Sequence, residues 1–234
     1  MPSHLTRKEL KQDSVALHVE KTFNFVKANR QNVVRATGAV LALVLIIAAT
    51  IYYRNSQRVV REQMLGDAIA LQTAPVGTAV PNGGLSFPTE AAKKSAVAAA
   101  FQKIISGHSG SSEAWVAEYS LGQMDIEAGK LADARTKYQN VADHAESNYA
   151  SLAKLALAQI DFADNKPADA RNILKDLMDH PTDLVSKDQA TFTLARGLIP
   201  TQPEEARKLL LAMAQSKSEI SQVAVAAMND LPAK

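Results

Sequence analysis

The sequence LADAR at residues 131–135 returns as PADAR at 167–171 and as PEEAR at 203–207. The copies lie 36 residues apart both times, and each copy has alanine in its fourth position. One period before the first of these alanines stands Ala98. Self-similarity at a fixed period of this size indicates a structural unit that is repeated along the chain.

Each repeat has room for two helices joined by a short turn. Turn-forming residues interrupt the helical pattern at Gly107–Ser111, Ala128–Lys130, Asn148, Asn165–Pro167, His180–Asp183 and Pro200–Pro203. Two helices in about 34 to 36 residues are the signature of a tetratricopeptide array, in which each unit buries its apolar face against the next. An unrelated alanine-rich helical bundle is the alternative.

Small and large residues recur at fixed places inside the unit. Gly122 and Ala158 stand twelve residues before Ala134 and Ala170, where a small residue lets the first helix of a pair approach the second. In the third unit the small residue, Ala195, comes one residue late, which predicts a turn one residue shorter. The residues expected to fill the groove between neighbouring helices, one turn after the repeated alanines, are Tyr138, Leu174 and Leu210.

The composition agrees with closely packed helices. Hydrophobic residues make up 47% of the chain but aromatic residues only 5%, which suits helices better than sheets. The chain has no cysteine, so disulfides, zinc–thiolate sites and thiol catalysis are excluded. A net charge of +2 gives no support for binding to nucleic acid.

An uncharged apolar stretch lies near the N-terminus. Residues 36–53 read ATGAVLALVLIIAATIYY, eighteen residues without a charge. A helix of this length spans about 27 Å, close to the hydrocarbon thickness of a bilayer, and Tyr52 and Tyr53 stand where an aromatic belt lies. A buried helix of a soluble domain and a cleaved signal peptide are the alternatives. The long charged head before the stretch, and the lack of a small-x-small cleavage site after it, favour an uncleaved anchor.

These signals predict an all-α chain with a single N-terminal transmembrane helix, followed by a tetratricopeptide-like α-solenoid of about three to four helix pairs. Residues 1–32 form a basic head, which the positive-inside rule places in the cytoplasm. Residues 33–53 form the transmembrane helix, and residues 54–89 form a juxtamembrane helix and a loop rich in proline and glycine. Residues 90–234 form the repeat domain on the other side of the membrane.

Three histidines follow the period of the repeat: His108, His144 and His180. Such a trio suggests a zinc site, but equivalent positions in stacked units lie about 8–10 Å apart or more, too far for one ion. Each histidine comes at the end of a second helix, where it can bond the last free carbonyl groups. We therefore expect helix caps, and we expect neither a metal nor another cofactor.

Acidic residues open the second helix of each pair, at Asp133, Asp169, Glu204 and Glu205. Carboxylates at that place complement the helix dipole, and Pro167 and Pro203 suit the first helical position. A catalytic carboxylate pair is the alternative, but equivalent residues of different repeats do not converge. The sequence also lacks the GxSxG, P-loop, GxGxxG and HExxH motifs, so we expect no enzyme and no small-molecule substrate.

The remaining candidate site is the surface formed by the first helices of the pairs, on the concave side of such an array. Three apolar side chains share one position relative to the small residue, namely Tyr119, Leu155 and Phe192. Three hydrogen-bonding side chains share the position just after it, namely Gln123, Gln159 and Arg196. An apolar stripe beside a polar row suits an extended or helical peptide. Alternatively, the next repeat or a terminal helix at 219–231 covers several of these residues.

The order of these features resembles a known family. The head HVEKTFNFVKANRQNVV (18–34), which leads into ATGAVLALVLII (36–47), is similar to that of the ancillary subunit of the SecYEG translocon, the YfgM-like family. The segment SGHSGSSEAWVAEYSLGQMDIEAGKLADAR (106–135) and its repeats are similar too, whereas the loop at 74–89 departs from a compact member of that family. The resemblance covers roughly residues 14–230.

The resemblance implies a single-pass protein of the bacterial inner membrane, with a cytoplasmic N-terminus and a periplasmic domain. That domain would contact translocon subunits, periplasmic chaperones or newly exported chains. The residues by themselves support a broader expectation, a membrane-tethered helical-repeat module that binds proteins. A cell-envelope or cell-division scaffold that uses the same repeats is one alternative, and an enzyme or cofactor-binding protein on a helical scaffold is another.

Overall fold

The computed structural model describes residues 30–77, 84–216 and 220–232 of the 234-residue chain. Within these ranges every regular element is a helix, and the β-type pairing is limited to an isolated bridge between Val76 and Phe87. The prediction of an all-α chain is confirmed at this level. Of the predicted basic head, only residues 30–32 are described, and they begin the first helix of the described ranges.

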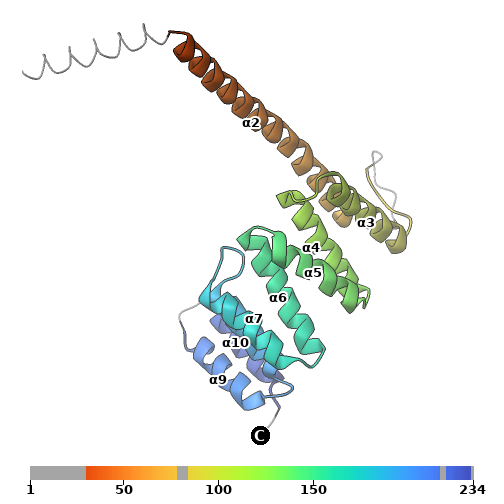
Figure 1. Cartoon of the computed structure of the whole chain (residues 1–234). Coiled ribbons are helices and arrows are strands. Elements are labelled where there is room, and N and C mark those ends of the chain that lie inside the picture. Colours follow the sequence, from red (N-terminus) through yellow and green to blue (C-terminus); the bar gives the residue numbers. More distant parts are fainter. Residues whose placement is uncertain (1–29, 78–83, 217–219, 233–234) are drawn as a thin grey trace, which may run out of the picture. The chain divides into compact units, whose positions relative to one another are not determined.

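The helices follow one another along the chain as Figure 1 shows. Their bounds are α2 Arg30–Thr73, α3 Glu90–Gly107, α4 Ser112–Glu127, α5 Leu131–His144, α6 Ser147–Ala163, α7 Pro167–Asp179, α8 Lys187–Leu198, α9 Pro203–Ala214, α10 Ser221–Ala227 and a 3-10 helix η2 Met228–Asp230. Each copy of the five-residue motif opens a helix, as its period predicts. The break expected at Asn148 is wrong by two residues, because α6 already begins at Ser147.

The chain divides into two compact units, residues 1–59 and residues 60–234. Helix α2 crosses the boundary between them, so the predicted juxtamembrane helix at 54–73 continues the apolar one without a break. In the first unit the apolar side chains of α2 face outwards, and Leu45 and Ile46 are 69% and 63% exposed. By length and composition, α2 is the one helix in the described part of the chain that could cross a membrane.

In the second unit each helix from α3 to α10 packs against the next one along the chain. Contacts also join α4 to α6 and α6 to α8, so the first helices of successive pairs lie beside one another. The buried side chains form four clusters that follow this order from α2 to α10. The core therefore extends along the series of helices and does not gather around one centre.

The helices that open with the repeated motif share one buried stripe. Its members lie at the motif alanine and four and seven residues later: Ala134, Tyr138 and Val141; Ala170, Leu174 and Leu177; Ala206, Leu210 and Met213. All nine are at most 6% exposed, so the prediction that Tyr138, Leu174 and Leu210 fill the space between helices is confirmed.

Helix α3 carries the same buried stripe in a register shifted by one residue. Its buried members are Val97, Phe101 and Ile104, whereas Ala98 is only partly buried. The extension of the 36-residue period to Ala98 is therefore wrong by one residue. The reason is that the position four residues after Ala98 is the polar Gln102, which is exposed.

The turn between α4 and α5 and the turn between α6 and α7 each contain one residue with a left-handed backbone conformation. Gly129 has φ 73° and Asn165, 36 residues later, has φ 57°. The Lys130 amide donates to the Asp125 carbonyl at 2.8 Å, and the Lys166 amide donates in the same way to the Asp161 carbonyl at 2.7 Å. This pattern satisfies the last free carbonyls of a helix and turns the chain sharply back.

The turn inside the third pair is longer than predicted. Residues 199–202 separate α8 from α9, whereas three residues, 128–130 and 164–166, separate the helices of the earlier pairs. The expected shortening is wrong because α8 itself ends early, after Leu198. Pro200 has no amide to donate, so the hydrogen bonds of the helix cannot continue through it, although Ile199 keeps helical dihedral angles.

The described residues between α2 and α3, 74–77 and 84–89, form no helix, as their proline and glycine content predicts. The Gly77 amide donates to the Phe87 carbonyl at 2.9 Å, and the Phe87 amide donates to the Pro75 carbonyl at 3.0 Å. Ala68 of α2 is fully buried in one cluster with Phe101 of α3. Residues 60–73 of α2 therefore serve as the packing partner of α3.

Candidate functional site

The six predicted surface residues line two hollows of the second unit, which share Gln159. The first, the tyrosine hollow, has a volume of about 430 Å³ and is lined by Tyr119, Gln123, Ile126, Glu127, Leu131, Tyr138, Ala156, Gln159, Ile160 and Ala163. The second, the arginine hollow, has a volume of about 560 Å³ and is lined by Leu155, Gln159, Phe162, Gln189, Phe192, Thr193, Arg196 and Gly197. Helices α4, α6 and α8 thus bring the predicted residues together.

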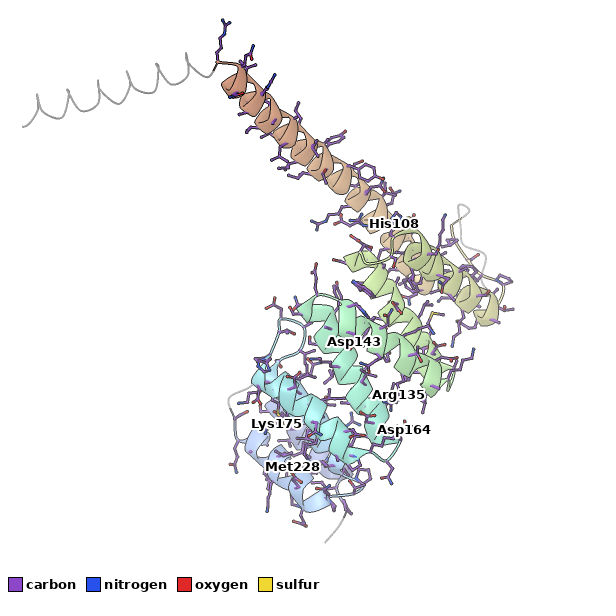
Figure 2. The ribbon with its side chains drawn as sticks, viewed as in Figure 1. His108, Arg135, Asp143, Asp164, Lys175 and Met228 are labelled. Atoms are coloured by element: carbon purple, nitrogen blue, oxygen red, sulfur yellow. The ribbon has the colours of Figure 1, made fainter. Side chains whose placement is uncertain are left out.

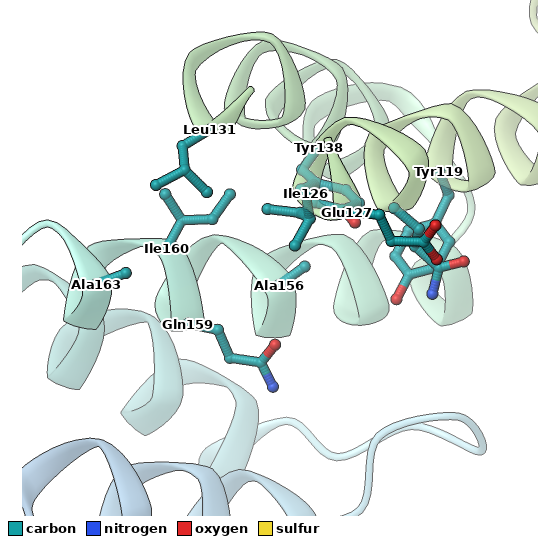
Figure 3. Close-up of a pocket in the computed structure, with 10 residues that line it drawn as sticks. Tyr119, Ile126, Glu127, Leu131, Tyr138, Ala156, Gln159, Ile160 and Ala163 are labelled. Atoms are coloured by element: carbon teal, nitrogen blue, oxygen red, sulfur yellow. The ribbon is translucent and has the colours of Figure 1, made fainter. Parts of the chain in front are cut away.

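The tyrosine hollow lies between α4, α5 and α6 (Figure 3). The ring centroids of Tyr119 and Tyr138 lie 5.2 Å apart, with their planes tilted by 53°. Gly122 makes room for this pair, because a β-carbon at residue 122 would lie 2.8 Å from the Tyr138 ring. Burial raises the pKa of Tyr119, and a hydrogen bond with Gln123 opposes this shift in part.

The arginine hollow lies between α6 and α8. The Arg196 guanidinium carbon is 6.0 Å from the centroid of the Phe192 ring, a distance at which a cation is attracted to the ring face. At the hollow's edge, a β-carbon at Gly197 would lie 2.2 Å from the Phe162 ring. Glycine therefore sets the close approach of α8 to α6.

The two predicted rows differ in exposure. Gln123, Gln159 and Arg196 are exposed, as a row of hydrogen-bonding groups must be to meet a partner. Tyr119 and Phe192 are partly buried, and Leu155 is only 7% exposed because it belongs to the core formed by α6, α7 and α8. The three apolar residues are thus more buried than expected, whereas the three hydrogen-bonding residues are exposed.

The sequence did not predict the residues of the tyrosine hollow that lie outside the two repeated positions of the first helices. Tyr138 was expected only to fill the core, and Leu131 only to open a helix. The tyrosine hollow also uses Ile126 and Ile160, which lie four residues after Gly122 and Ala156. The period of the repeat could have located these positions, but not the space left between their side chains.

The three periodic histidines lie at the ends of three different helices. His108 and His180 are the residues that follow α3 and α7, and His144 ends α5. The Nδ1 of His144 lies 2.9 Å from the Asn140 carbonyl oxygen, and that of His180 lies 3.2 Å from the Asp176 carbonyl oxygen. The predicted bonding of terminal carbonyls is confirmed for these two. His144 also stacks on Trp115, with ring centroids 6.1 Å apart.

The acidic residues predicted for the first helical turns lie there. Asp133, Asp169, Glu204 and Glu205 occupy the first turns of α5, α7 and α9. They do not form one group with the histidines, and no cluster of three or more potential metal ligands occurs in the described ranges.

A nearly buried carboxylate, Glu113, lies at the start of α4. Its Oε2 accepts a hydrogen bond from Arg61 Nε of α2 at 2.8 Å. Burial by itself would raise the Glu113 pKa, but hydrogen bonds from its own backbone amide and from Arg61 outweigh burial and hold the pKa below its usual value. The pair therefore ties residues 60–73 of α2 to α4.

No protein-family model, curated protein or solved structure matches this chain.

Proposed function

We propose that the chain is a membrane-tethered protein–protein interaction module, an accessory of the protein-export translocon that contacts chaperones or exported chains. In this proposal α2 anchors the protein in the bacterial inner membrane, the N-terminus is cytoplasmic and the second unit is periplasmic. The helix pairs form a tetratricopeptide-like solenoid, and the groove made by the two hollows binds the partner. The function needs no cofactor and no catalytic group.

One observation supports this function more than any other. The two hollows meet at Gln159, and they expose three hydrogen-bonding side chains from equivalent places on α4, α6 and α8 above apolar floors. A glutamine side chain both donates and accepts, so Gln123 and Gln159 match the amide and carbonyl groups of a peptide main chain. Arg196 adds a charge that favours an acidic group of the partner.

The regular spacing of the helices supports the proposal. Three helix pairs begin their second helices 36 residues apart, and the same three positions of each second helix are buried. Repetition of this kind presents equivalent side chains in a row, which suits an extended partner. Anchoring such a module raises its effective concentration near a membrane partner without any new contact.

Crosslinking in native membranes, followed by mass spectrometry of the adducts, tests the choice of partner. Recovery of translocon subunits, periplasmic chaperones or exported chains supports the proposal. Recovery of division or wall-assembly proteins without them supports the alternative, a cell-envelope or cell-division scaffold that uses the same groove. The matched control is the same chain with Gln159→Lys and Arg196→Glu, which should lose the adducts while it remains folded.

A further inference from the structure

We infer that the tyrosine hollow is a specificity pocket for one partner side chain with an aromatic body and a polar tip, a tyrosine or a tryptophan of an extended peptide. This inference rests on the proposed function and adds which residue of the partner the groove selects. The main evidence is the hydroxyl of Tyr138, which has no hydrogen-bond partner and lies in a pocket whose other walls are mostly apolar.

Tyr138 is only 2% exposed, yet it lines the tyrosine hollow. Its hydroxyl has no hydrogen-bond partner among the described residues. Among those same residues, Arg207 Nε is the side-chain nitrogen or oxygen that is both fully buried and without a hydrogen bond. The Tyr138 hydroxyl has no hydrogen bond either, so it must be in contact with solvent. Because Tyr119 and Gly122 cover the ring and Tyr138 lines the hollow, we infer that solvent reaches the hydroxyl through the hollow.

A ligand that enters the hollow displaces the water that solvates this hydroxyl. If the ligand brings only carbon, the hydroxyl is left buried and unpaired, which is unfavourable. A partner side chain with its own O–H or N–H replaces the lost water. The raised pKa of Tyr138, caused first by burial and then by Tyr119 and Asp125, keeps the hydroxyl protonated and able to donate or accept.

The size and lining of the hollow suit an aromatic body. A cavity of about 150 Å³ already holds benzene, and the tyrosine hollow has about 430 Å³. The remaining volume accommodates main chain beside the ring. Ile126, Leu131 and Ile160 supply apolar walls, while Tyr119 offers a ring for tilted packing (Figure 3).

The test selects peptides on the full chain held in lipid nanodiscs. Phage-displayed random twelve-residue peptides are selected against the wild type, Tyr138→Phe and Tyr149→Phe, with empty nanodiscs as counter-selection. Tyr149 is the matched control, because it is a partly buried tyrosine of α6 that does not line the hollow. Thermal unfolding verifies that both variants fold, since each change removes a single oxygen atom.

We expect tyrosine or tryptophan to be enriched at one peptide position on the wild type and on Tyr149→Phe, but phenylalanine or leucine on Tyr138→Phe. Replacing the selected tyrosine by phenylalanine should weaken binding to the wild type about two- to twelvefold, the effect of one hydrogen bond. On Tyr138→Phe the same replacement should change affinity less than twofold. Enrichment of the same residues on the wild type and Tyr138→Phe overturns the pocket and leaves the proposed function standing. No enrichment over empty nanodiscs overturns both.

Discussion

The arginine that ends each copy of the motif connects its helix to a later part of the chain. Arg135 Nη2 lies 2.8 Å from carboxylate oxygens of both Asp161 and Asp164 at the end of α6, and Figure 2 labels two of these residues. The two terminal nitrogens of Arg171 donate to the Glu205 carboxylate of α9 at 2.6 and 2.8 Å. The sequence shows that this arginine recurs, but its partners differ from copy to copy and could not be predicted from the period.

The pair formed by Arg171 and Glu205 predicts a dependence of stability on pH. The hydrogen bonds from Arg171 lower the Glu205 pKa, so the stabilisation is present above the ordinary glutamate pKa and is lost as pH falls through the lowered one. Because the two side chains are 36% and 40% exposed, Arg171→Met should cost only about 0.5–1 kcal/mol at neutral pH. This cost should shrink toward zero at strongly acidic pH.

Urea unfolding of the full chain in detergent, followed by the fluorescence of the chain's single tryptophan, Trp115, measures this cost at each pH. Lys175→Met on the exposed face of α7 is the matched control and should show no such trend. A cost for Arg171→Met that stays constant down to acidic pH would contradict the assignment.

Within one helix, the buried stripe requires a small side chain at one position, whereas an exposed position of the same helix tolerates a larger one. Ala170 is fully buried in α7, whereas Ala168 of the same helix is exposed. Ala170→Leu should lower the free energy of unfolding by about 1–3 kcal/mol through overpacking, and Ala168→Leu should change it by no more than about 0.5 kcal/mol. Equal effects in the same urea titration would rule out the stripe.

Substitutions at two helical glycines distinguish the effect of close packing on stability from the effect of helix propensity. Gly66 has no atom within 4 Å of the place of its missing β-carbon, so Gly66→Ala should stabilise by about 0.5–1 kcal/mol. At Gly197 the added carbon would lie 2.2 Å from the Phe162 ring. Gly197→Ala should therefore destabilise by about 1–3 kcal/mol despite its better propensity. A stabilised Gly197→Ala protein would show that α6 and α8 are not in close contact.

Helix bounds were more predictable than the site, because they depend on local chemistry. Pro167 and Pro203 mark the starts of α7 and α9, and Gly129 and Asn165 mark the turns before α5 and α7. The members of each pair lie one period of 36 residues apart. Where local chemistry changes, as at Pro200, the turn length predicted from the position of Ala195 is wrong. The hollows, in contrast, depend on how side chains of different helices pack together, which no single stretch of sequence determines. The missing β-carbon of Gly122 and the ring of Tyr138 define such a space only once α4 and α5 are packed.

At the scale of the whole molecule, the proposed orientation predicts which part a protease can reach. Protease added from the periplasmic side should digest the second unit and spare the head at residues 1–32, because α2 would separate the two. Antibodies against tags at each end would report the fragments. Protection of the second unit with loss of the head would reverse the proposed orientation.

In the proposed function, a protein partner binds in the groove at Gln159. Site-specific photocrosslinking in intact membranes tests it directly, with a benzoylphenylalanine at residue 159 or, as the control, at Lys175, which is exposed on α7. We predict a discrete protein adduct from residue 159 that is weakened by Arg196→Glu, and none from residue 175. Adducts of equal yield from both positions, or an adduct from residue 175 alone, would contradict the claim.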